Sequence, residues 1–442
     1  MSFRHGRPNI LTGTIYIQMN TSLRPFLIVF GILFWLSVYS LAQAATYYVA
    51  PTGNNANPGT IGQPFATLQK AQDVANPGDT IYMRGGTYTL TSYVNITKSG
   101  SAGNVINVLN YPAEIPILDG INLTNDSFPN IRLSGSYWYI KGLEIINAPY
   151  SGIYITGSNN TIEFSNVHHN VQLNAQGGGI QVASGSSNLI LNNDVHHQSY
   201  GAGGTGGDGI EVAPQLTGNV IRGNRVWRNH DDGIDLWGSK GVLVENNWVW
   251  QNGYDDSLIK TSGNGCGIKL GGSGDANEGT HTVRNNVLWH NGEDGINDNG
   301  ATNPSTIYNN TAYDHVRSGM YNFNFWSAHA NVLRNNLSFA GNGVSINGSV
   351  NAQYNSWNNP PSVTVTSGDF VTTDFIANTA ARQADGSLPV TSFLRLAAGS
   401  DLIDKGTDVG IAYTGSAPDL GAYEYVNSVA SPPAPGNLVV GR

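Results

Sequence analysis

A short unit built on Gly-Ile, or its equivalent, recurs along the middle of the chain. The unit begins at Gly152, Gly179, Gly209, Gly233, Gly267, Gly295, Gly319 and Gly343. Successive units lie roughly 24 to 34 residues apart, and short β-branched runs between them lack the 3.6-residue period of a helix. A repeat of this length cannot bury its own apolar face, so the pattern predicts a solenoid of stacked coils.

A second repeated stretch lies between these units. It appears as TIEFSNVHHN (161–170), LILNNDVHHQ (189–198), VIRGNRVWRN (220–229), LVENNWVWQN (243–252), TVRNNVLWHN (282–291), IYNNTAYDH (307–315) and LRNNLSFAGN (333–342). Two or three short strands per turn, separated by Asn and Gly, predict an all-β fold: a right-handed parallel β-helix of roughly ten coils. A leucine-rich repeat has a similar period, but its Leu framework is absent.

The composition agrees with a solenoid. The chain has 55 Gly and about 50 Asn, while charged residues make up only 12 %. This balance excludes a disordered chain and a helical bundle. The net charge of −9, without a basic run, argues against a nucleic-acid partner. A single Cys, Cys266, excludes an internal disulfide.

The aligned repeats place Asn in one column and aromatic rings in another. The first column is Ser165, Asn193, Asn224, Asn247, Asn286, Asn310 and Asn336. Asn tolerates the left-handed backbone of tight turns, and stacked amides can hydrogen-bond from coil to coil. The second column is His168, His196, Trp227, Trp250, Trp289, Tyr313 and Phe339. The His pairs 168/169 and 196/197 suggest metal ligands, but the Trp and Tyr elsewhere in the column favour an aromatic stack.

The N-terminus has the pattern of a targeting segment. Residues 26–41 form an apolar run preceded by Arg24 and followed by a small-x-small site at 42–44. This order is typical of a cleaved secretory signal peptide, and the run is short for a membrane span. We expect residues 1–44 to be a signal peptide, with Met19 as an alternative start. The mature protein is then secreted and has no membrane attachment.

The rest of the chain predicts one domain at 45–426. Residues 64–75 carry the clearest helical pattern, which ends at Pro77-Gly78. A helix there would cover the open end of the solenoid. Residues from about 350 lose the repeat and are expected to form the C-terminal cap. The tail 427–442 is linker-like.

In a chain short of charge, acids gather on adjacent repeats. The acids and the lysine concerned are Asp208, Glu211, Asp231, Asp232, Asp235 and Lys269. Asp208 and Asp232 each precede Gly-Ile, so they should stack about one strand spacing apart. Glu211, Asp235 and Lys269 each follow Gly-Ile and should share an outward-facing column, because the Ile points inward.

Stacked carboxylates repel one another unless a counter-ion lies between them. Ca²⁺ accepts six to eight oxygen ligands in flexible geometry, so the cluster predicts a Ca²⁺ site. Lys269 can also pair with Asp235 of the adjacent coil. The largest insertions are near these coils, at 198–207, 253–265 and 271–280, and binding sites are commonly built on such loops.

These residues resemble the site of the family 9 polysaccharide lyases, which are Ca²⁺-dependent pectate lyases with a parallel β-helix. The resemblance covers residues 45–426, and its specific part is NHDDGIDLW (229–237). It implies that four Asp bind the catalytic Ca²⁺ and that a Lys is the base. The matching positions are Asp208, Asp231, Asp232, Asp235 and Lys269. Glu211 is an added acid that could contact metal or substrate.

The resemblance implies a secreted, monomeric enzyme that cleaves pectate, an acidic plant cell-wall polysaccharide, by β-elimination. Such a lyase removes the proton on C5 of the uronate and expels the 4-O-linked sugar, and Ca²⁺ neutralises the developing charge. A Lys base must be deprotonated, so we expect an alkaline pH optimum. No general acid is evident.

Three alternatives stay open. The family also contains rhamnogalacturonan lyases, so the substrate is not fixed, and neither is endo or exo action. A polygalacturonase-type hydrolase could use Asp231-Asp232 as its carboxylate pair, although its Gly-His-Gly and Arg-Ile-Lys motifs are absent. A non-catalytic glycan-binding solenoid would need neither Lys269 nor acids in one register.

Overall fold

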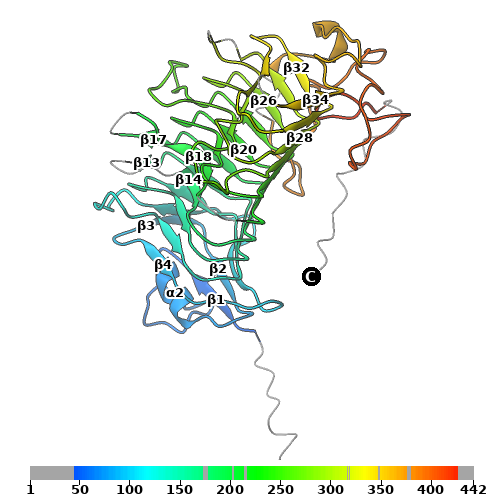
Figure 1. Ribbon diagram of the computed structural model, residues 1–442. Helices are drawn as coiled ribbons and strands as arrows, with labels where there is room; N and C mark the ends of the chain where they lie inside the picture. The colour runs from blue at the N-terminus through cyan, green and yellow to red at the C-terminus, as the bar shows by residue number, and fades with distance from the viewer. Residues whose placement is uncertain are drawn as a thin grey trace, which may run out of the picture. The chain divides into compact units, whose positions relative to one another are not determined.

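Three long parallel sheets run along the described part of the chain (Figure 1). The computed structural model describes residues 44–426 except 173–177, 202–203, 214–216, 316, 318, 347–348 and 376–379. The predicted signal peptide, apart from its last residue, and the predicted tail lie outside the described residues. Within the described ranges, no helix is long and apolar enough to span a bilayer.

Each sheet contains one strand from each successive coil. Sheet 1 is β1 (Thr46–Val49), β2 (Thr80–Met83), β5 (Ile106–Asn110), β8 (Trp138–Lys141), β11 (Thr161–Glu163), β15 (Leu189–Leu191), β19 (Val220–Arg222), β22 (Leu243–Glu245), β25 (Thr282–Arg284), β28 (Thr306–Tyr308), β31 (Val332–Arg334) and β34 (Asn351–Gln353). Sheet 2 is β4 (Val94–Ile96), β7 (Ile131–Leu133), β10 (Ile153–Ile155), β14 (Gly178–Val182), β18 (Asp208–Val212), β21 (Ile234–Asp235), β24 (Ile268–Lys269), β27 (Ile296–Asn297), β30 (Phe323–Phe325) and β33 (Val344–Ile346).

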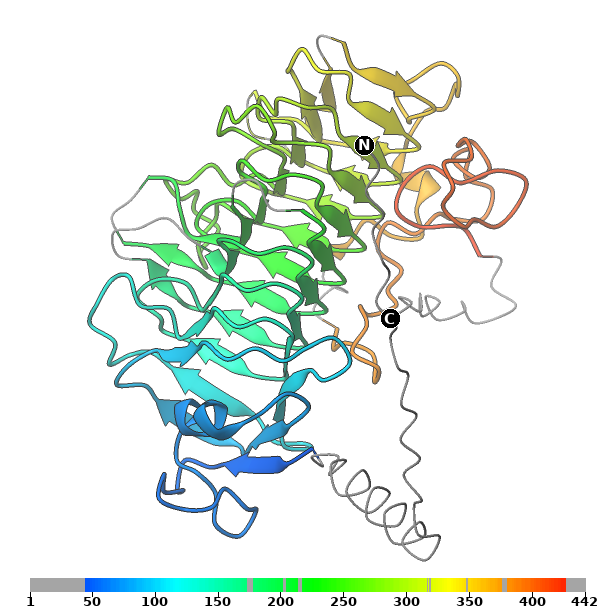
Figure 2. The same ribbon diagram turned by 60° about the horizontal axis from the view of Figure 1, so that its bottom comes forward.

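Sheet 3 completes the coils. It is β3 (Gly86–Thr89), β6 (Pro116–Asp119), β9 (Glu144–Ile146), β12 (Asn166–His168), β16 (Asp194–His196), β20 (Arg225–Trp227), β23 (Trp248–Trp250), β26 (Val287–Trp289), β29 (Thr311–Tyr313) and β32 (Leu337–Phe339). A two-stranded ribbon pairs β13 (Val171–Gln172) with β17 (Ser199–Tyr200). Figure 2 shows the stacked strands running in the same direction. The predicted parallel β-helix is therefore confirmed.

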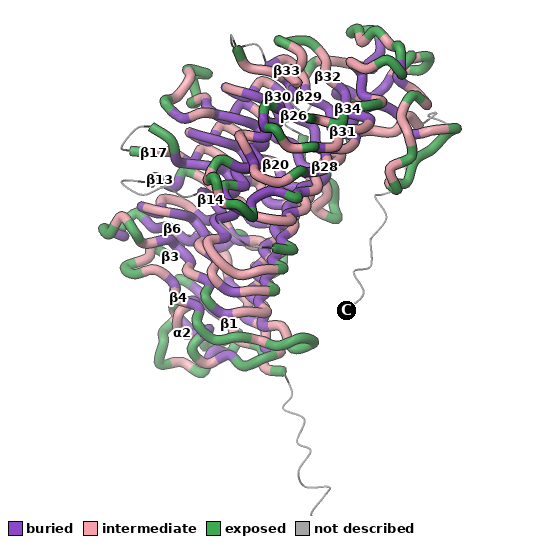
Figure 3. The backbone as a smooth tube through the Cα atoms, in the orientation of Figure 1, coloured by how far each residue is buried: buried purple, intermediate pink, exposed green. Residues whose placement is uncertain are grey.

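The core is a set of inward-facing columns. On sheet 2, Ile234 pairs with Ile210 on one side and Ile268 on the other, and all three are fully buried. Figure 3 shows the same contrast along the coils, with buried strands and exposed loop tips. The Gly-Ile unit holds this register at most coils. Gly319 is an exception, because Phe323 is the residue that pairs with Ile296 and fills the interior.

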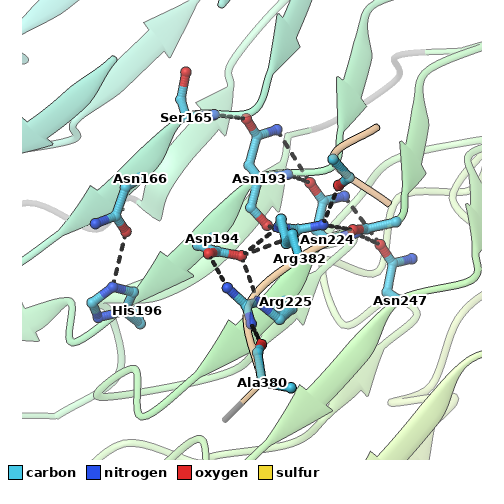
Figure 4. A network of polar contacts seen from close by, with 12 residues as sticks. Ser165, Asn166, Asn193, Asp194, His196, Asn224, Arg225, Asn247, Ala380 and Arg382 are labelled. Carbon is cyan, nitrogen blue, oxygen red and sulfur yellow. Dashed lines mark hydrogen bonds and ion pairs between the residues drawn. The ribbon is translucent and has the colours of Figure 1, made fainter. Parts of the chain in front are cut away.

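The Asn column is confirmed as a ladder of hydrogen bonds. Asn193 donates its side-chain amide to Asn224 Oδ1 at 3.1 Å, and Asn224 donates to Asn247 Oδ1 at 3.0 Å (Figure 4). The left-handed corner is taken instead by the residue just before, such as Asn192 (φ 54°) and Asn246 (φ 56°). In each Asn-Asn pair the first residue makes the turn and the second hydrogen-bonds the neighbouring coils. The left-handed turn and the hydrogen bonding, both predicted for one column, thus belong to two adjacent residues.

Replacing Asn247 by Ala is expected to destabilise the protein by roughly 3 kcal/mol or more. Its Nδ2 donates to Ile221 O and Asn286 Oδ1, both at 2.9 Å, so the change leaves several buried polar groups unpaired, each worth about 1–3 kcal/mol. Urea unfolding followed by circular dichroism measures the loss. The control is Asn246→Gly, which keeps the positive φ at an exposed position; equal losses in the two variants would contradict the ladder.

The predicted N-terminal helix is present but shorter than expected. Helix α2 spans Leu68–Val74 instead of 64–75, because Thr67 is its N-cap and accepts the amide of Lys70. Phe65 precedes the helix and pairs with Val49 of β1. The helix buries Leu68 and Ala71 against the first coils, as a cap should.

The C-terminal segment only partly caps the solenoid. Trp357 lies against Phe323 near the last coils. Phe370, just after the 3-10 helix η1 (Ser367–Asp369), packs on Phe339 of the last strand of sheet 3, but later residues contact earlier coils. Phe393 packs on Trp289, and Arg382 pairs with Asp194 at 2.7 Å (Figure 4). The segment runs back along the solenoid because the outward aromatic face of sheet 3 needs apolar cover.

The aromatic column on sheet 3 is also confirmed. Trp227 stacks on Trp250 and Trp250 on Trp289, each with ring centroids 4.8 Å apart. At the N-terminal end of the column, His196 stacks between His168 and Trp227.

Candidate active site on sheet 2

The acids of the sequence cluster come together on three adjacent strands of sheet 2. Glu211 on β18 pairs in register with Asp235 on β21, which pairs with Lys269 on β24. These three residues form the predicted outward-facing column. The column continues through Gln181 on one side and Asn297 on the other. All three side chains are buried even though they face away from the core.

Lys269 is held by two carboxylates. Its Nζ lies 2.6 Å from Asp232 Oδ2 and 2.8 Å from Asp235 Oδ2. Burial by itself lowers the pKa of Lys269, but the neighbouring Asp232 and Asp235 outweigh it and raise that pKa well above its usual range. Lys269 is therefore the counter-charge of the cluster in the absence of another cation.

The Asp residues that precede Gly-Ile form a second column. Asp208 Oδ1 accepts the amide of Asp232 at 3.0 Å, and Asp232 Oδ1 accepts the amide of Cys266 at 2.7 Å. Each carboxylate is thus fixed by the backbone of the next coil. Ligand oxygens of Asp208, Asp232 and Asp235 all lie within 4.8 Å of one another. These three residues form the acidic triad.

Asp231 has different contacts from the triad. Its carboxylate accepts the amide of Gly206 at 2.7 Å and also the amide of Asn264. Gly206 and Asn264 belong to two separate insertions, so Asp231 joins these loops beside the site. Burial, with help from Asp232, raises the pKa of Asp231 to about 7.

The electrostatics of the cluster fit a hard cation. Burial and the neighbouring charge raise the pKa of Glu211 to about 8 and that of Asp235 to about 6, and they raise the pKa of Asp208 well above its usual range. Glu211 Oε2 and Asp235 Oδ1 are buried and have no hydrogen-bond partner. Buried oxygens of this kind are unfavourable unless paired. The donor set contains only oxygens, which suits Ca²⁺.

Sequence analysis missed two exposed tryptophans beside the site. Trp237 and Trp326 are 43 % and 51 % exposed. Each stands two residues after an outward-facing position, Asp235 and Asn324, so both are placed on the outward face of sheet 2. The indole of Trp326 lies over Gly300, whose missing side chain leaves room for the ring. The sequence signal that could have found them is an aromatic residue two positions after the outward-facing residue of the repeat.

Comparison with known proteins agrees with the parallel β-helix architecture. A family model described as Pel9A-like, right handed beta helix region, matches residues 47–336. Pectate lyase L of Dickeya chrysanthemi is 35 % identical over 402 residues, covering 86 % of this chain and 90 % of that protein. The chain belongs to the Pel9A-like right-handed β-helix family.

Solved structures give the same result. A crystal structure of pectate lyase Pel9A aligns with a TM-score of 0.76 at 33 % identity, covering 87 % of this chain and 97 % of that one. A rhamnogalacturonan lyase aligns with a TM-score of 0.69 at 27 % identity, covering 80 % and 97 %. The resemblance to family 9 polysaccharide lyases is confirmed, and so is the assignment of the chain as a polysaccharide lyase.

Proposed function

We propose that the protein is a secreted, Ca²⁺-dependent pectate lyase in which Lys269 is the base. The observation that carries the proposal is the placement of Lys269 Nζ against Asp232 and Asp235, where Asp235 is the in-register neighbour of Glu211, whose Oε2 is buried and has no hydrogen-bond partner. A base and a set of cation ligands thus occupy one face. Secretion is supported by the N-terminal apolar run and its small-x-small site.

The proposed metal ligands are the acidic triad of Asp208, Asp232 and Asp235, with Glu211 as an additional oxygen donor. Asp231 remains the fourth ligand implied by the family resemblance, although two backbone amides already bind its carboxylate. Bound Ca²⁺ would place positive charge next to the uronate carboxylate of the substrate and next to Asp232 and Asp235, the residues that hold Lys269.

Lys269 performs the proton transfer in this mechanism. Its neutral Nζ takes the proton from C5, the electron pair forms the C4=C5 double bond, and the C4–O bond breaks. Solvent protonates the leaving sugar oxygen. Because Asp232 and Asp235 favour the protonated ammonium, turnover requires these ion pairs to weaken. This requirement supports the expected alkaline pH optimum.

The substrate proposal rests on the relatives. Pectate lyase L and pectate lyase Pel9A carry pectate in their names, and both match more than four fifths of this chain. The rhamnogalacturonan lyase match favours a second candidate substrate, a pectic polymer with alternating sugars. Both candidates are acidic polysaccharides with a proton α to a carboxylate.

One assay tests the proposal. The protein is incubated with de-esterified pectin, and separately with rhamnogalacturonan, while ultraviolet absorbance of the 4,5-unsaturated product is followed with Ca²⁺ and with chelator. We expect Ca²⁺-dependent absorbance with pectate. Absorbance with rhamnogalacturonan alone would favour the second substrate. Reducing ends without absorbance would indicate hydrolysis and would contradict a lyase.

Trp326→Ala is expected to raise KM for long pectate chains about tenfold with a smaller change in kcat. Trp237 and Trp326 follow the ends of β21 and β30, strands three coils or about 14 Å apart, so together they could stack on well-separated sugars of one chain. An aromatic contact of about 1.4 kcal/mol corresponds to that factor. Steady-state kinetics on long and short oligomers measures it. The control is Tyr413→Ala, an exposed aromatic of the C-terminal segment; an unchanged KM for Trp326→Ala would exclude the stacking role.

A further inference from the structure

Four histidines form a compact array on sheet 3, away from the acidic cluster of sheet 2. His168 at the end of β12 pairs in register with His196 at the end of β16. Their rings stack with centroids 4.7 Å apart and planes within 4°. The following residues, His169 and His197, stack in the same way at 5.1 Å and 2°. Two coils therefore present two His-His pairs, one above the other.

Within each pair, the Nδ1 atoms face each other. His168 Nδ1 lies 2.6 Å from His169 Nδ1, and His196 Nδ1 lies 2.5 Å from His197 Nδ1. Two nitrogen atoms this close need either a shared proton or a cation, because two lone pairs pointing at each other repel. The aromatic stack explains His168 and His196, but it does not explain this orientation of both members of each pair.

The opposite ring nitrogens of His168, His196 and His197 have oxygen partners. His168 Nε2 lies 3.1 Å from Glu144 Oε1, and His197 Nε2 lies 2.7 Å from Asp256 Oδ1. An ionised carboxylate accepts only, so these Nε2 atoms carry the hydrogen and leave Nδ1 as a lone pair. His196 Nε2 likewise lies 3.0 Å from Asn166 Oδ1 (Figure 4). Carboxylate partners on the far nitrogen are the usual support of metal-binding imidazoles.

We propose that His168, His169, His196 and His197 bind one transition-metal ion, such as Zn²⁺ or Cu²⁺, through their Nδ1 atoms. Ligand atoms of His168, His169 and His196 already lie within 4.8 Å of one another. Metal–nitrogen bonds of about 2.0–2.1 Å place neighbouring ligands about 3 Å apart or slightly more, so each Nδ1 pair has to open by less than 1 Å. The stacked rings of the two coils, with centroids 4.7 and 5.1 Å apart, have to tilt toward one shared point between them. Imidazole ligands select such metals over Ca²⁺, which makes this site distinct from the acidic cluster.

The array is reachable from solvent and is joined to a loop of the acidic site. His169 is exposed and the other three rings are half-buried. Burial lowers the pKa of His196 to about 2, so its ring is neutral, as a metal ligand must be. Asp256, the partner of His197, lies in the 253–265 insertion, whose Asn264 binds Asp231. A bound ion would link the two coils and would fix His197, whose ion pair with Asp256 holds the 253–265 loop.

The test is calorimetric titration of tag-free protein with ZnCl₂, in excess Ca²⁺ to keep the acidic cluster occupied. We expect one equivalent to bind, and at least tenfold weaker binding in the double variant His169→Asn, His197→Asn. Asn suits the left-handed backbone at both positions, where φ is 53°, so the fold should persist. The matched control is His290→Asn, which has φ of 53° but follows a Trp instead of a His.

A second measurement needs no variant. Electron paramagnetic resonance of the Cu²⁺-loaded wild-type protein counts nitrogen ligands, and we expect three or four. Equal Zn²⁺ binding by the wild type and the double variant would overturn the proposal, as would oxygen ligation of Cu²⁺. Absence of stoichiometric Zn²⁺ binding would also overturn the proposal, and would show instead that one shared proton lies between the two Nδ1 atoms of each pair.

Discussion

Replacing Lys269 by Ala is expected to lower kcat on pectate by about a thousandfold or more while leaving the fold intact. A positioned general base contributes roughly 10²–10⁴ in rate, and the described residues offer no second amine between Asp232 and Asp235. The side chain faces outward from sheet 2, so its removal leaves the core column of Ile residues untouched. Initial rates of 4,5-unsaturated product formation at saturating Ca²⁺ measure the effect.

Two further variants separate the base from a simple positive charge. Lys269→Arg keeps the charge opposite Asp232 and Asp235, but guanidinium stays protonated at all accessible pH values. We expect it to be as inactive as Lys269→Ala. Lys405→Ala, an exposed lysine of the C-terminal segment, should retain full activity. Substantial activity in Lys269→Arg would mean that Lys269 acts only as a counter-charge and that another group removes the proton.

The outward column of the site could be predicted from sequence because a parallel β-helix stacks equivalent residues. Once Gly-Ile fixed the register, Glu211, Asp235 and Lys269 had to be neighbours, and the structure pairs them in that order. The same logic found the Asn ladder and the aromatic column. Repeats determine which residues lie above one another, and hydrogen bonds between coils follow from that placement.

Residues outside the repeat could not be placed in this way. Asp231 adjoins Asp232 in sequence, but its contacts depend on two insertions whose course the repeat does not specify. The contacts of the described C-terminal residues with sheet 3 likewise join segments far apart in sequence: Phe393 packs on Trp289, and Trp248 donates a hydrogen bond to Tyr423. The orientation of the His Nδ1 atoms was also hidden, because it depends on the partners Glu144 and Asp256.

Removing Ca²⁺ is expected to abolish turnover and to lower the melting temperature, and the thermal effect should grow with pH. The folded state raises the pKa of Glu211, Asp231 and Asp235 to about 8, 7 and 6, so the folded protein holds these protons more tightly than the unfolded chain. The stabilisation from these protons is full below pH ~4 and is lost as pH rises through 6 to 8. The metal-free protein should therefore become less stable to unfolding as pH rises from 6 to 8.

Ca²⁺ reverses this loss because it binds the carboxylates that have lost their protons. At a concentration 100-fold above Kd it adds about 2.7 kcal/mol, which shifts the melting temperature by several degrees at most for a domain of this size. Calorimetry at pH 5 and pH 8.5, with Ca²⁺ and with chelator, measures the difference. We expect a clearly larger Ca²⁺ shift at pH 8.5, and an equal shift at both pH values would contradict the carboxylate site.

Glu211→Gln provides the decisive control, because it is expected to have opposite effects in the two states. Without Ca²⁺ above pH 8, the change removes a buried negative charge whose Oε2 has no partner, so the variant should be more stable than the wild type. With Ca²⁺, the loss of an oxygen donor should reduce the stabilisation. A variant less stable in both states would show that Glu211 supports the fold through its charge and that the cluster does not depend on a cation for balance.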